Sequence, residues 1–342
     1  MTYQITIQPS GNRYSAKAYE SILQAAIDSG LNIPYGCRNG TCGSCKGSII
    51  SGEVDYGDYT SGALSEAEKA AGKALFCCAK PLTDLVIESR EMTDGIVAAR
   101  IIPARVDRKV QLSHDVMALF LKLPSNERLQ FKAGQYIEFL LKDGKRRAFS
   151  LANAPHIDNT LELHLRLIPG GQFTEYVFSE MPDKAIMRIE APFGSFYLRE
   201  DSDKPIIMVA GGTGFAPIKG IIEHMLHHKI NRQVTLYWGA RALEDLYMPA
   251  LPESWAHTYP NIEFIPVLSD AKPEDNWTGR TGFVHQAVLE DFATTGLNDY
   301  EVYCCGAPGM VEVAHASFVE AGLDIDAFFS DAFNYAKPVI NK

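Results

Sequence analysis

The stretch CRNGTCGSCKG, residues 37–47, decides how the N-terminal part of the chain is interpreted. It holds three of the seven cysteines within nine residues, separated by glycines and small polar residues. Three thiols this close together can form a disulfide, bind a metal ion or hold an inorganic cluster. The remainder of the sequence has to distinguish these alternatives.

The spacing of the cysteines favours the cluster. Cys37, Cys42 and Cys45 follow the pattern C-x4-C-x2-C, and a fourth cysteine, Cys77, lies further along in LFCCAKP. This spacing is typical of a plant-type 2Fe-2S site and differs from the paired CxxC motifs of a zinc ribbon. Cys78 competes with Cys77 for the fourth position. Three glycines beside these cysteines allow the backbone to approach an inorganic group closely: Gly36, Gly40 and Gly43.

Length and composition are typical of a globular protein with several domains. The 342 residues exceed what one hydrophobic core usually organises, and 46% of them are hydrophobic. The N-terminus MTYQITIQPSG lacks the features of a signal peptide, and no run approaches about 18 apolar residues. We therefore expect a cytoplasmic chain without a membrane partner. In that reducing compartment an odd number of cysteines argues against a disulfide framework. The net charge of −10 argues against a nucleic-acid partner.

Three patterns of apolar residues divide the chain into three predicted domains. Residues 1–93 combine short strands, one helix and the cysteine loop, which predicts a small α+β domain. Residues 97–200 contain alternating runs such as MALFLKL, QYIEFLL, LELHLRLI and AIMRIEA, which predict an antiparallel barrel or sandwich. In residues 203–342 the apolar strands PIIMVA, QVTLYWG, IEFIPVL and YEVYCCG alternate with helical or loop stretches. That order predicts a parallel sheet with crossover helices.

Two local patterns next to the cysteine loop predict particular elements. SILQAAIDSGL, residues 21–31, predicts a helix in which Ser21 and Gln24 resemble a capping box and Gly30 ends the helix. GSIISGEVDY, residues 47–56, predicts a β-hairpin. The cysteine loop is therefore expected between a helix and a strand.

Two motifs in the second domain combine an arginine, an aromatic ring and the start of a predicted helix. RRAFSLAN, residues 146–153, ends a predicted barrel strand, and taken alone it equally describes an ordinary strand with an exposed arginine. Further on, LHLRLIPGGQFTEYVF contains a Gly-Gly turn that opens a predicted helix with Thr174 near its start. Helix N-termini bind anions. A flavin dinucleotide has a pyrophosphate for Arg147 and this helix, and a flat ring for Phe149.

Two motifs in the third domain indicate a nucleotide site. PIIMVAGGTGFAPIKG, residues 205–220, runs from a strand through glycines into a helix, although Pro217 takes the last place of the G-x-G-x-x-G fingerprint. YCCGAPGM, residues 303–310, repeats the arrangement after Cys305 and Gly306. Each motif alone is also compatible with a plain strand-to-helix turn. Together they place backbone amides at the sheet edge where ligands of parallel sheets bind.

With these motifs in place, the chain resembles the ferredoxin-NAD(P)H reductase superfamily in the arrangement with the ferredoxin domain first. It is similar to the reductase components of benzoate dioxygenase, methane monooxygenase and phenol hydroxylase, and to CDP-6-deoxy-3,4-glucoseen reductase. The resemblance covers nearly all 342 residues. It implies a β-grasp ferredoxin domain, an antiparallel β-barrel FAD domain and an α/β NAD(P) domain. It also implies Cys77 rather than Cys78 as the fourth ligand, because Pro81 then follows at the distance typical of the family.

The resemblance assigns roles to individual residues. Arg147 would contact the FAD phosphates, Phe149 the flavin, and Ser150 would lie near the flavin N5 atom. Cys305 would lie near the nicotinamide ring, so Ser150 and Cys305 are the expected catalytic residues, and Phe333 would cover the flavin. The cluster ligands would be Cys37, Cys42, Cys45 and Cys77. Further FAD contacts are expected from Leu151, Arg166, Gly171, Gln172 and Thr174. The nicotinamide nucleotide pocket is expected to contain Gly211, Gly212, Thr213, Gly214 and Gly306.

The resemblance implies an oxidoreductase that carries electrons from NADH through FAD and a 2Fe-2S cluster to a protein acceptor. A hydride delivers two electrons and a cluster takes one, so a flavin is needed between them. The first expected acceptor is an oxygenase component, and the second is a sugar dehydratase. Glu244 and Asp245, near Arg241 in YWGARALEDLY, favour NADH, with NADPH as the alternative. Rival functions are reduction of free flavin or ferric iron, a zinc scaffold, and a redox sensor using Cys304 and Cys305.

Overall fold

The computed structural model describes residues 1–91 and 97–333. The chain forms two compact units that divide between Ala98 and Ala99. The predicted domain ends at residues 93 and 342 lie outside the described residues. Within the described ranges, no helix combines the length and the apolar character needed to cross a membrane.

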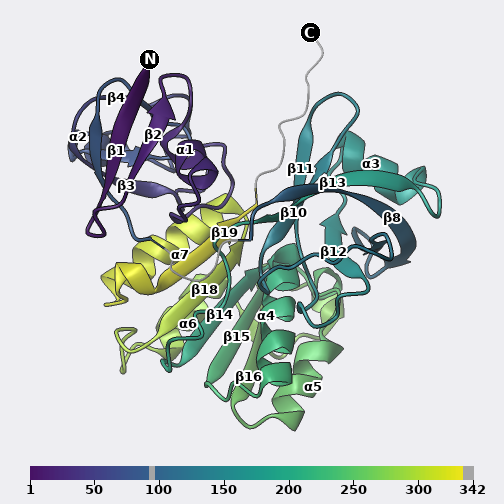
Figure 1. Ribbon diagram of the computed structural model, residues 1–342. Helices are drawn as coiled ribbons and strands as arrows, with labels where there is room; N and C mark the ends of the chain where they lie inside the picture. Colours follow the sequence, from purple (N-terminus) through teal and green to yellow (C-terminus); the bar gives the residue numbers. More distant parts are fainter. Residues whose placement is uncertain (92–96, 334–342) are drawn as a thin grey trace. The chain divides into compact units, whose positions relative to one another are not determined.

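A mixed five-stranded sheet with the order β2-β1-β7-β3-β5 forms the first unit (Figure 1). Strands β1 and β7 are parallel, whereas the other neighbours pair antiparallel. The strands are β1 (Thr2–Gln8), β2 (Arg13–Lys17), β3 (Lys46–Ser51), β5 (Lys73–Leu75) and β7 (Leu85–Glu88). The unit also contains helices α1 (Ile22–Asp28) and α2 (Glu66–Ala70), and the strand pair β4 (Val54–Asp55) and β6 (Lys80–Pro81). The predicted α+β domain of the β-grasp type is confirmed.

The core of this unit fixes the segments that carry the cysteines. Ile5 and Ile7 of β1 and Ile22 of α1 are completely buried. The Phe76 N–H donates to Cys45 O at 3.0 Å, which joins the segment after β5 to the cysteine loop. The cysteine loop and the segment of Cys77 are therefore held together by backbone hydrogen bonds.

The hairpin predicted at residues 47–56 is wrong. Strand β3 pairs with β5 and β7, whereas β4 pairs only with β6 among the described strands. Gly52 between them has φ +96°, and a Cβ there would lie 2.3 Å from Asp84 O. The turn therefore packs closely against the chain before β7 and sends the two strands into different sheets.

The second unit begins with an antiparallel barrel (Figure 1). Its strand order is β11-β10-β13-β8-β9-β12, and a bridge between Leu151 and Leu163 joins the first strand of that order to the last. Buried residues alternate with exposed ones along β8, as in Ile102, Ala104 and Val106. The elements are β8 (Arg100–Gln111), β9 (Val116–Lys122), β10 (Tyr136–Leu140), β11 (Arg146–Ser150), β12 (Leu161–Arg166), α3 (Gln172–Ser179) and β13 (Ile186–Phe193). The predicted barrel is confirmed.

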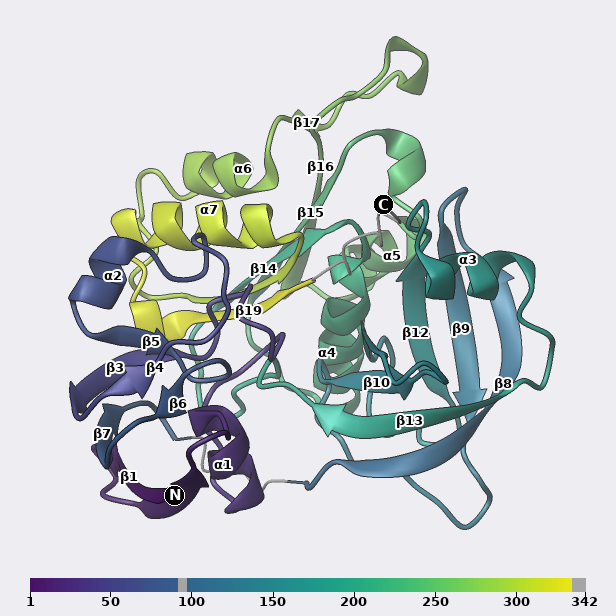
Figure 2. The same ribbon diagram turned by 90° about the horizontal axis from the view of Figure 1, so that it is seen from above.

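A parallel six-stranded sheet with the order β17-β16-β15-β14-β18-β19 completes the second unit. Helices α4 and α5 lie on one face, and α6 and α7 lie on the other (Figures 1 and 2). The strands are β14 (Ile206–Gly211), β15 (Val234–Ala240), β16 (Ile262–Leu268), β17 (Arg280–Thr281), β18 (Glu301–Gly306) and β19 (Phe328–Ala332). The helices are α4 (Phe215–His228), α5 (Ala250–Thr258), α6 (Val284–Asp291) and α7 (Pro308–Glu320). All strands end at one edge because they are parallel, as the apolar pattern predicts.

Candidate functional site

The four predicted cluster cysteines form two pairs in the first unit. A hydrogen bond between Cys37 and Cys42 lowers the pKa of Cys37 and raises that of Cys42. A second hydrogen bond joins Cys45 and Cys77 and raises the pKa of Cys77. Each pair therefore places two thiols side by side, and such thiols become thiolates when they bind a metal.

Backbone amides point at the sulfur atoms of these pairs. The Cys37 N–H donates to Cys42 Sγ at 3.3 Å, and the Asn39 N–H to Cys37 Sγ at 3.5 Å. The Cys77 N–H donates to Cys45 Sγ, also at 3.5 Å. Hydrogen bonds to sulfur are what metal-bound thiolates need to offset their negative charge. The loop therefore fits an iron–sulfur group.

Glycines leave the space that this loop requires. Gly40 has φ +76°, and a Cβ there would lie 2.7 Å from Cys78 Sγ and 2.8 Å from Asp58 O. A Cβ on Gly36 would lie 3.2 Å from Cys42 Sγ. A side chain at either position would push directly on the sulfurs.

The arrangement of donors distinguishes one metal ion from two. Within the described ranges, the single group of three His, Cys, Asp or Glu ligand atoms within 4.8 Å of one another is His114, Asp115 and Asp245. The cysteine sulfurs do not converge in this way on one point, as a tetrahedral zinc site would require. Two pairs of sulfurs fit a two-iron group better.

A second site lies in the second unit, where the end of β11 meets β19. Ser150 Oγ donates a buried hydrogen bond of 3.1 Å to Asp331 Oδ2. Asp331 lies opposite Cys305 in the β18–β19 pairing. Burial, together with the nearby Asp331 carboxylate, raises the pKa of Cys305, so its thiol stays protonated. The structure thus brings the two predicted catalytic residues to one carboxylate that sequence reasoning missed, although FFSDAF contained it.

Alternation along β11 separates two arginines. Arg146 pairs with Glu138 at 2.7 Å and also with Glu190. Arg147 points to the other side of the strand and makes no ion pair with any residue in the described ranges; its guanidinium donates to the Arg146 carbonyl at 2.8 Å. The positive charge of Arg147 is therefore available for an anion. Its neighbour Phe149 is half-buried.

Some of the remaining predicted FAD residues are buried, and others are exposed. Phe149 packs its ring against Phe173 of α3 at 5.6 Å between ring centroids. Leu151 is completely buried in the barrel core, whereas Gln172 is exposed. Thr174 Oγ1 accepts from the Ile168 N–H at 3.1 Å and thereby holds the turn before α3.

The N-terminus of α3 has no side-chain cap, because its N-cap residue is Gly171. The first N–H groups of the helix therefore remain uncapped, and such groups bind anions. This helix end, together with Arg147, fits the pyrophosphate of a dinucleotide.

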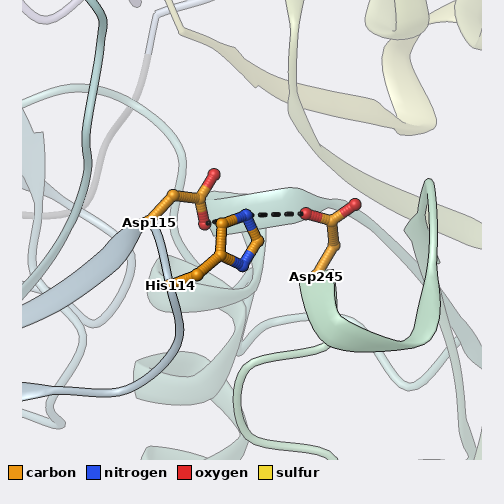
Figure 3. A group of neighbouring side chains, drawn as sticks. All are labelled: His114, Asp115 and Asp245. Carbon is orange, nitrogen blue, oxygen red and sulfur yellow. Dashed lines mark ion pairs between the residues drawn. The ribbon is translucent and has the colours of Figure 1, made fainter.

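Arg166 is held by carboxylates beside the glycine loop. Its Nε lies 2.7 Å from Asp115 Oδ2, and its Nη2 lies 3.3 Å from Asp245 Oδ1. His114 Nε2 lies 3.8 Å from each of these two carboxylates (Figure 3). A Cβ on Gly212 would lie 2.8 Å from Arg166 Nη1. Arg166 thus links the end of β12 to the glycine loop, and its contact with FAD phosphate stays a prediction.

The glycine loop after β14 leaves room for the end of β18. A Cβ on Gly214 would lie 2.0 Å from Cys305 O, and one on Gly211 would lie 2.5 Å from Met310 Sδ. Gly306 approaches Gly211 in the same way, since its own Cβ would lie 3.1 Å from Gly211 Cα. These glycines therefore let two strand ends touch at the carboxyl edge of the sheet.

Two further predicted residues lie at the same edge. Thr213 is buried in the short helix η1 (Gly212–Gly214). Phe333 is half-buried, and its N–H donates to Gly306 O at 2.8 Å. The predicted nucleotide residues therefore gather at one edge, whereas the cover that Phe333 would form over the flavin stays a prediction.

Comparisons with known proteins match these features. The 2Fe-2S iron-sulfur cluster binding domain matches residues 5–82, the oxidoreductase FAD-binding domain matches 103–197, and the oxidoreductase NAD-binding domain matches 208–316. The chain is 40% identical over 334 residues to the CDP-6-deoxy-L-threo-D-glycero-4-hexulose-3-dehydrase reductase of Yersinia pestis, covering 97% of this chain and 99% of that protein. The chain belongs to the ferredoxin-NAD(P)H reductase superfamily. It is a fused iron–sulfur flavoprotein reductase.

Other relatives of this reductase serve oxygenases by name. The phenol hydroxylase P5 protein of Acinetobacter pittii is 36% identical over 328 residues, which cover 94% of this chain and 92% of that protein. The crystal structure of Amycolatopsis cytochrome P450 reductase GcoB has a TM-score of 0.76 and 34% identity, covering 97% of this chain and 98% of that one. The comparisons confirm the predicted NAD(P)H-dependent oxidoreductase and its cofactors, 2Fe-2S, FAD and NAD.

The structure of this reductase weakens the rival that uses Cys304 and Cys305 as a redox sensor. Both thiols are completely buried. Burial raises the pKa of Cys304 as well as that of Cys305, so neither is a reactive thiolate. Adjacent residues in a strand also point to opposite faces of the sheet.

The residues on which the prediction of NADH over NADPH depends form ion pairs with other side chains of the protein. Asp245 is buried, and its Oδ2 lies 3.4 Å from the exposed Arg241 Nε. Glu244 pairs with Lys272 at 2.7 Å. Asp245 therefore partly balances the positive charge of Arg241 before any nucleotide binds.

Proposed function

We propose that this reductase passes electrons from NADH, by way of FAD and a 2Fe-2S cluster, to a separate protein partner. The observation that carries the proposal is the two pairs of thiols with backbone N–H groups pointing at their sulfurs. They lie in one chain with flavin and nucleotide domains. Bound flavin supplies the chemistry of accepting a hydride and releasing electrons singly. We assign the cluster ligands as Cys37, Cys42, Cys45 and Cys77.

The residues of the second unit position the reactants. Asp331 of β19 accepts from Ser150 Oγ and so fixes the orientation of this hydroxyl at the end of β11. Cys305 supplies a neutral thiol that is completely buried. Arg147 and the uncapped start of α3 attract the pyrophosphate of FAD. The glycine loop, residues 211–214, presents backbone amides to the nicotinamide nucleotide.

We further infer the bounds and setting of the chain. The domains are a ferredoxin-type domain at 1–93, a FAD domain at 97–200 and a NAD(P) domain at 203–342. NADH is the preferred donor, because Asp245 already partly matches the charge of Arg241, the arginine that an additional phosphate of NADPH would need. None of the seven cysteines, which all lie within the described ranges, forms a disulfide, and this supports a cytoplasmic location.

The electron acceptor that we propose first is an oxygenase component. Its support is the similarity to the phenol hydroxylase P5 protein and to the terephthalate 1,2-dioxygenase reductase component 1 of Comamonas sp, 34% identical over 337 residues. A sugar dehydrase is the second candidate, supported by the 40% identity with the Yersinia pestis reductase.

Visible spectroscopy tests the electron path. The purified chain is expected to show overlapping flavin and iron–sulfur absorption that bleaches with NADH. Cys42→Ser should remove the iron–sulfur signal in electron paramagnetic resonance (EPR) while NADH still reduces the flavin. A full EPR signal from this variant would contradict the ligand assignment. A colourless protein would contradict the whole proposal.

Reconstitution with purified partners tests the acceptor. NADH consumption is measured with the oxygenase component of a phenol hydroxylase and its substrate, and separately with a sugar dehydrase and its substrate. Coupled product formation with the oxygenase supports the first candidate. Coupling with the dehydrase alone supports the second, and reduction of only free flavin or ferric salts would contradict both.

A further inference from the structure

A fifth thiol lies beside the four proposed cluster ligands. Cys78 follows Cys77 directly, and their Sγ atoms are 3.6 Å apart, within hydrogen-bond distance for sulfur. Both side chains are half-buried. They line a surface pocket of the first unit together with Tyr19 and Gly57. The four proposed ligands complete the cluster site without Cys78. The role of Cys78 therefore has to be inferred from its contacts.

The backbone holds Cys78 in place on several sides. The Cys78 N–H donates to Leu75 O at 2.9 Å. A Cβ on Gly40, in the cysteine loop, would lie 2.7 Å from Cys78 Sγ, and one on Gly57 would lie 2.7 Å from Cys78 O. The thiol is therefore fixed between the cysteine loop and Cys77.

The direction of the hydrogen bond follows from metal binding. Without metal, either sulfur could be the donor. When Cys77 binds iron it is a thiolate without a proton, so only the Cys78 S–H can donate. A hydrogen bond to a ligand sulfur stabilises the extra negative charge of the reduced cluster.

We propose that Cys78 is a positioning residue that donates an S–H hydrogen bond to the Cys77 sulfur and raises the reduction potential of the cluster. The proposal rests on the proposed function, since it takes Cys77 as a cluster ligand. It gives Cys78 a role in how readily the cluster accepts single electrons, without a covalent bond to iron.

Redox titration of the full chain with its cofactors tests this role. The potential of the cluster is followed by EPR in the wild type, Cys78→Ala and Cys78→Ser. We expect Cys78→Ala to lower the reduction potential of the cluster by about 30 mV. This shift corresponds to about a threefold change in the one-electron equilibrium constant. Cys78→Ser should restore most of the shift, because its O–H can still donate. Ser61→Ala is the control, because Ser61 is exposed and lies in the same unit.

Two outcomes would overturn the proposal. If Cys78→Ala and the wild type have the same potential, the thiol does not tune the cluster. If Cys78→Ala loses the cluster while Cys77→Ala keeps it, Cys78 is the fourth ligand itself. Neither outcome contradicts the proposed electron path, whose failure would appear as absent flavin and cluster absorption or as no electron delivery to a protein partner.

Discussion

At the scale of single residues, the sites depend on close approaches and on a few buried polar contacts. Gly40 leaves space for a sulfur atom, and Asp331 receives the hydroxyl of Ser150. The spacing of Cys37, Cys42 and Cys45 predicted that these thiols gather, because the loop is short, whereas the choice of Cys77 over Cys78 came from the family resemblance. No local pattern predicted Asp331, since it lies 181 residues from Ser150 in the sequence.

Gly40→Ala should cause loss of most of the bound iron. The new Cβ would lie 2.7 Å from Cys78 Sγ, at a φ of +76° that already costs an L-residue about 1 kcal/mol. Iron content and visible absorbance per chain measure the effect. Gly11→Ala is the matched control, because Gly11 has φ +78° and open space around it. Equal iron content in the two variants would show that the contact with Cys78 does not matter.

Asp331→Ala should slow flavin reduction by NADH about tenfold to a hundredfold, because the Ser150 hydroxyl loses the acceptor that orients it. Ser150→Ala should slow it to a similar extent, and the double variant should add little further. Stopped-flow measurement of the flavin band at saturating NADH isolates this step. Ser179→Ala, at an exposed serine on α3, should keep the wild-type rate. Fully additive losses would argue that the two residues act separately.

At the scale of elements, local patterns predicted helices and strands better than their pairing. Ser21 caps α1 as predicted, since its side chain accepts from the Gln24 N–H. The reciprocal half of the capping box is not formed: the Gln24 side chain donates to Asp28 at 2.7 Å. The prediction that β3 and β4 form a hairpin failed because strand pairing is not a local property. The partner of each strand depends on the arrangement of the whole sheet.

Ser21→Ala should lower the free energy of unfolding of the first unit by about 1 kcal/mol, because α1 loses its N-cap hydrogen bond. Gln24→Ala should cost less, about 0.2–0.5 kcal/mol, because the Gln24 side chain bonds within and beside the helix. Urea unfolding followed by circular dichroism compares the two variants. A larger loss for Gln24→Ala would mean that its contact with Arg38 matters more than the cap.

At the scale of the whole molecule, a buried polar network joins the barrel to the parallel sheet inside the second unit. Lys219 of α4 donates to Ala152 O at 3.0 Å, just beyond β11, and pairs with Glu162 of β12 at 3.0 Å and with Glu223 at 2.9 Å. A Cβ on Gly220 would lie 3.1 Å from Asn153 O, so the helix packs directly on this backbone. The same contacts therefore hold the helix that follows the glycine loop against the barrel strands that carry the predicted flavin residues.

Lys219→Met should destabilise the second unit by about 1–3 kcal/mol, because the half-buried Glu162 and Glu223 would lose their cation. Thermal unfolding of the full chain measures the loss. Lys142→Met, at an exposed position, is the matched control and should leave the transition unchanged. If Lys219→Met unfolds at the same temperature as the wild type, water stabilises the two carboxylates in place of Lys219.

The sequence by itself determined what depends on neighbours along the chain. Cysteine spacing, strand alternation and glycine-rich turns predicted a small α+β domain, an antiparallel barrel or sandwich and a parallel sheet with crossover helices. The comparisons confirmed the family and the cofactors. Only the tertiary structure decided the pairing of Ser150 with Asp331, the place of Arg166 between Asp115 and Asp245, and the contact of Lys219 with Glu162. These contacts join residues far apart in sequence, and their partners follow from strand order and helix packing, which local periodicity does not encode.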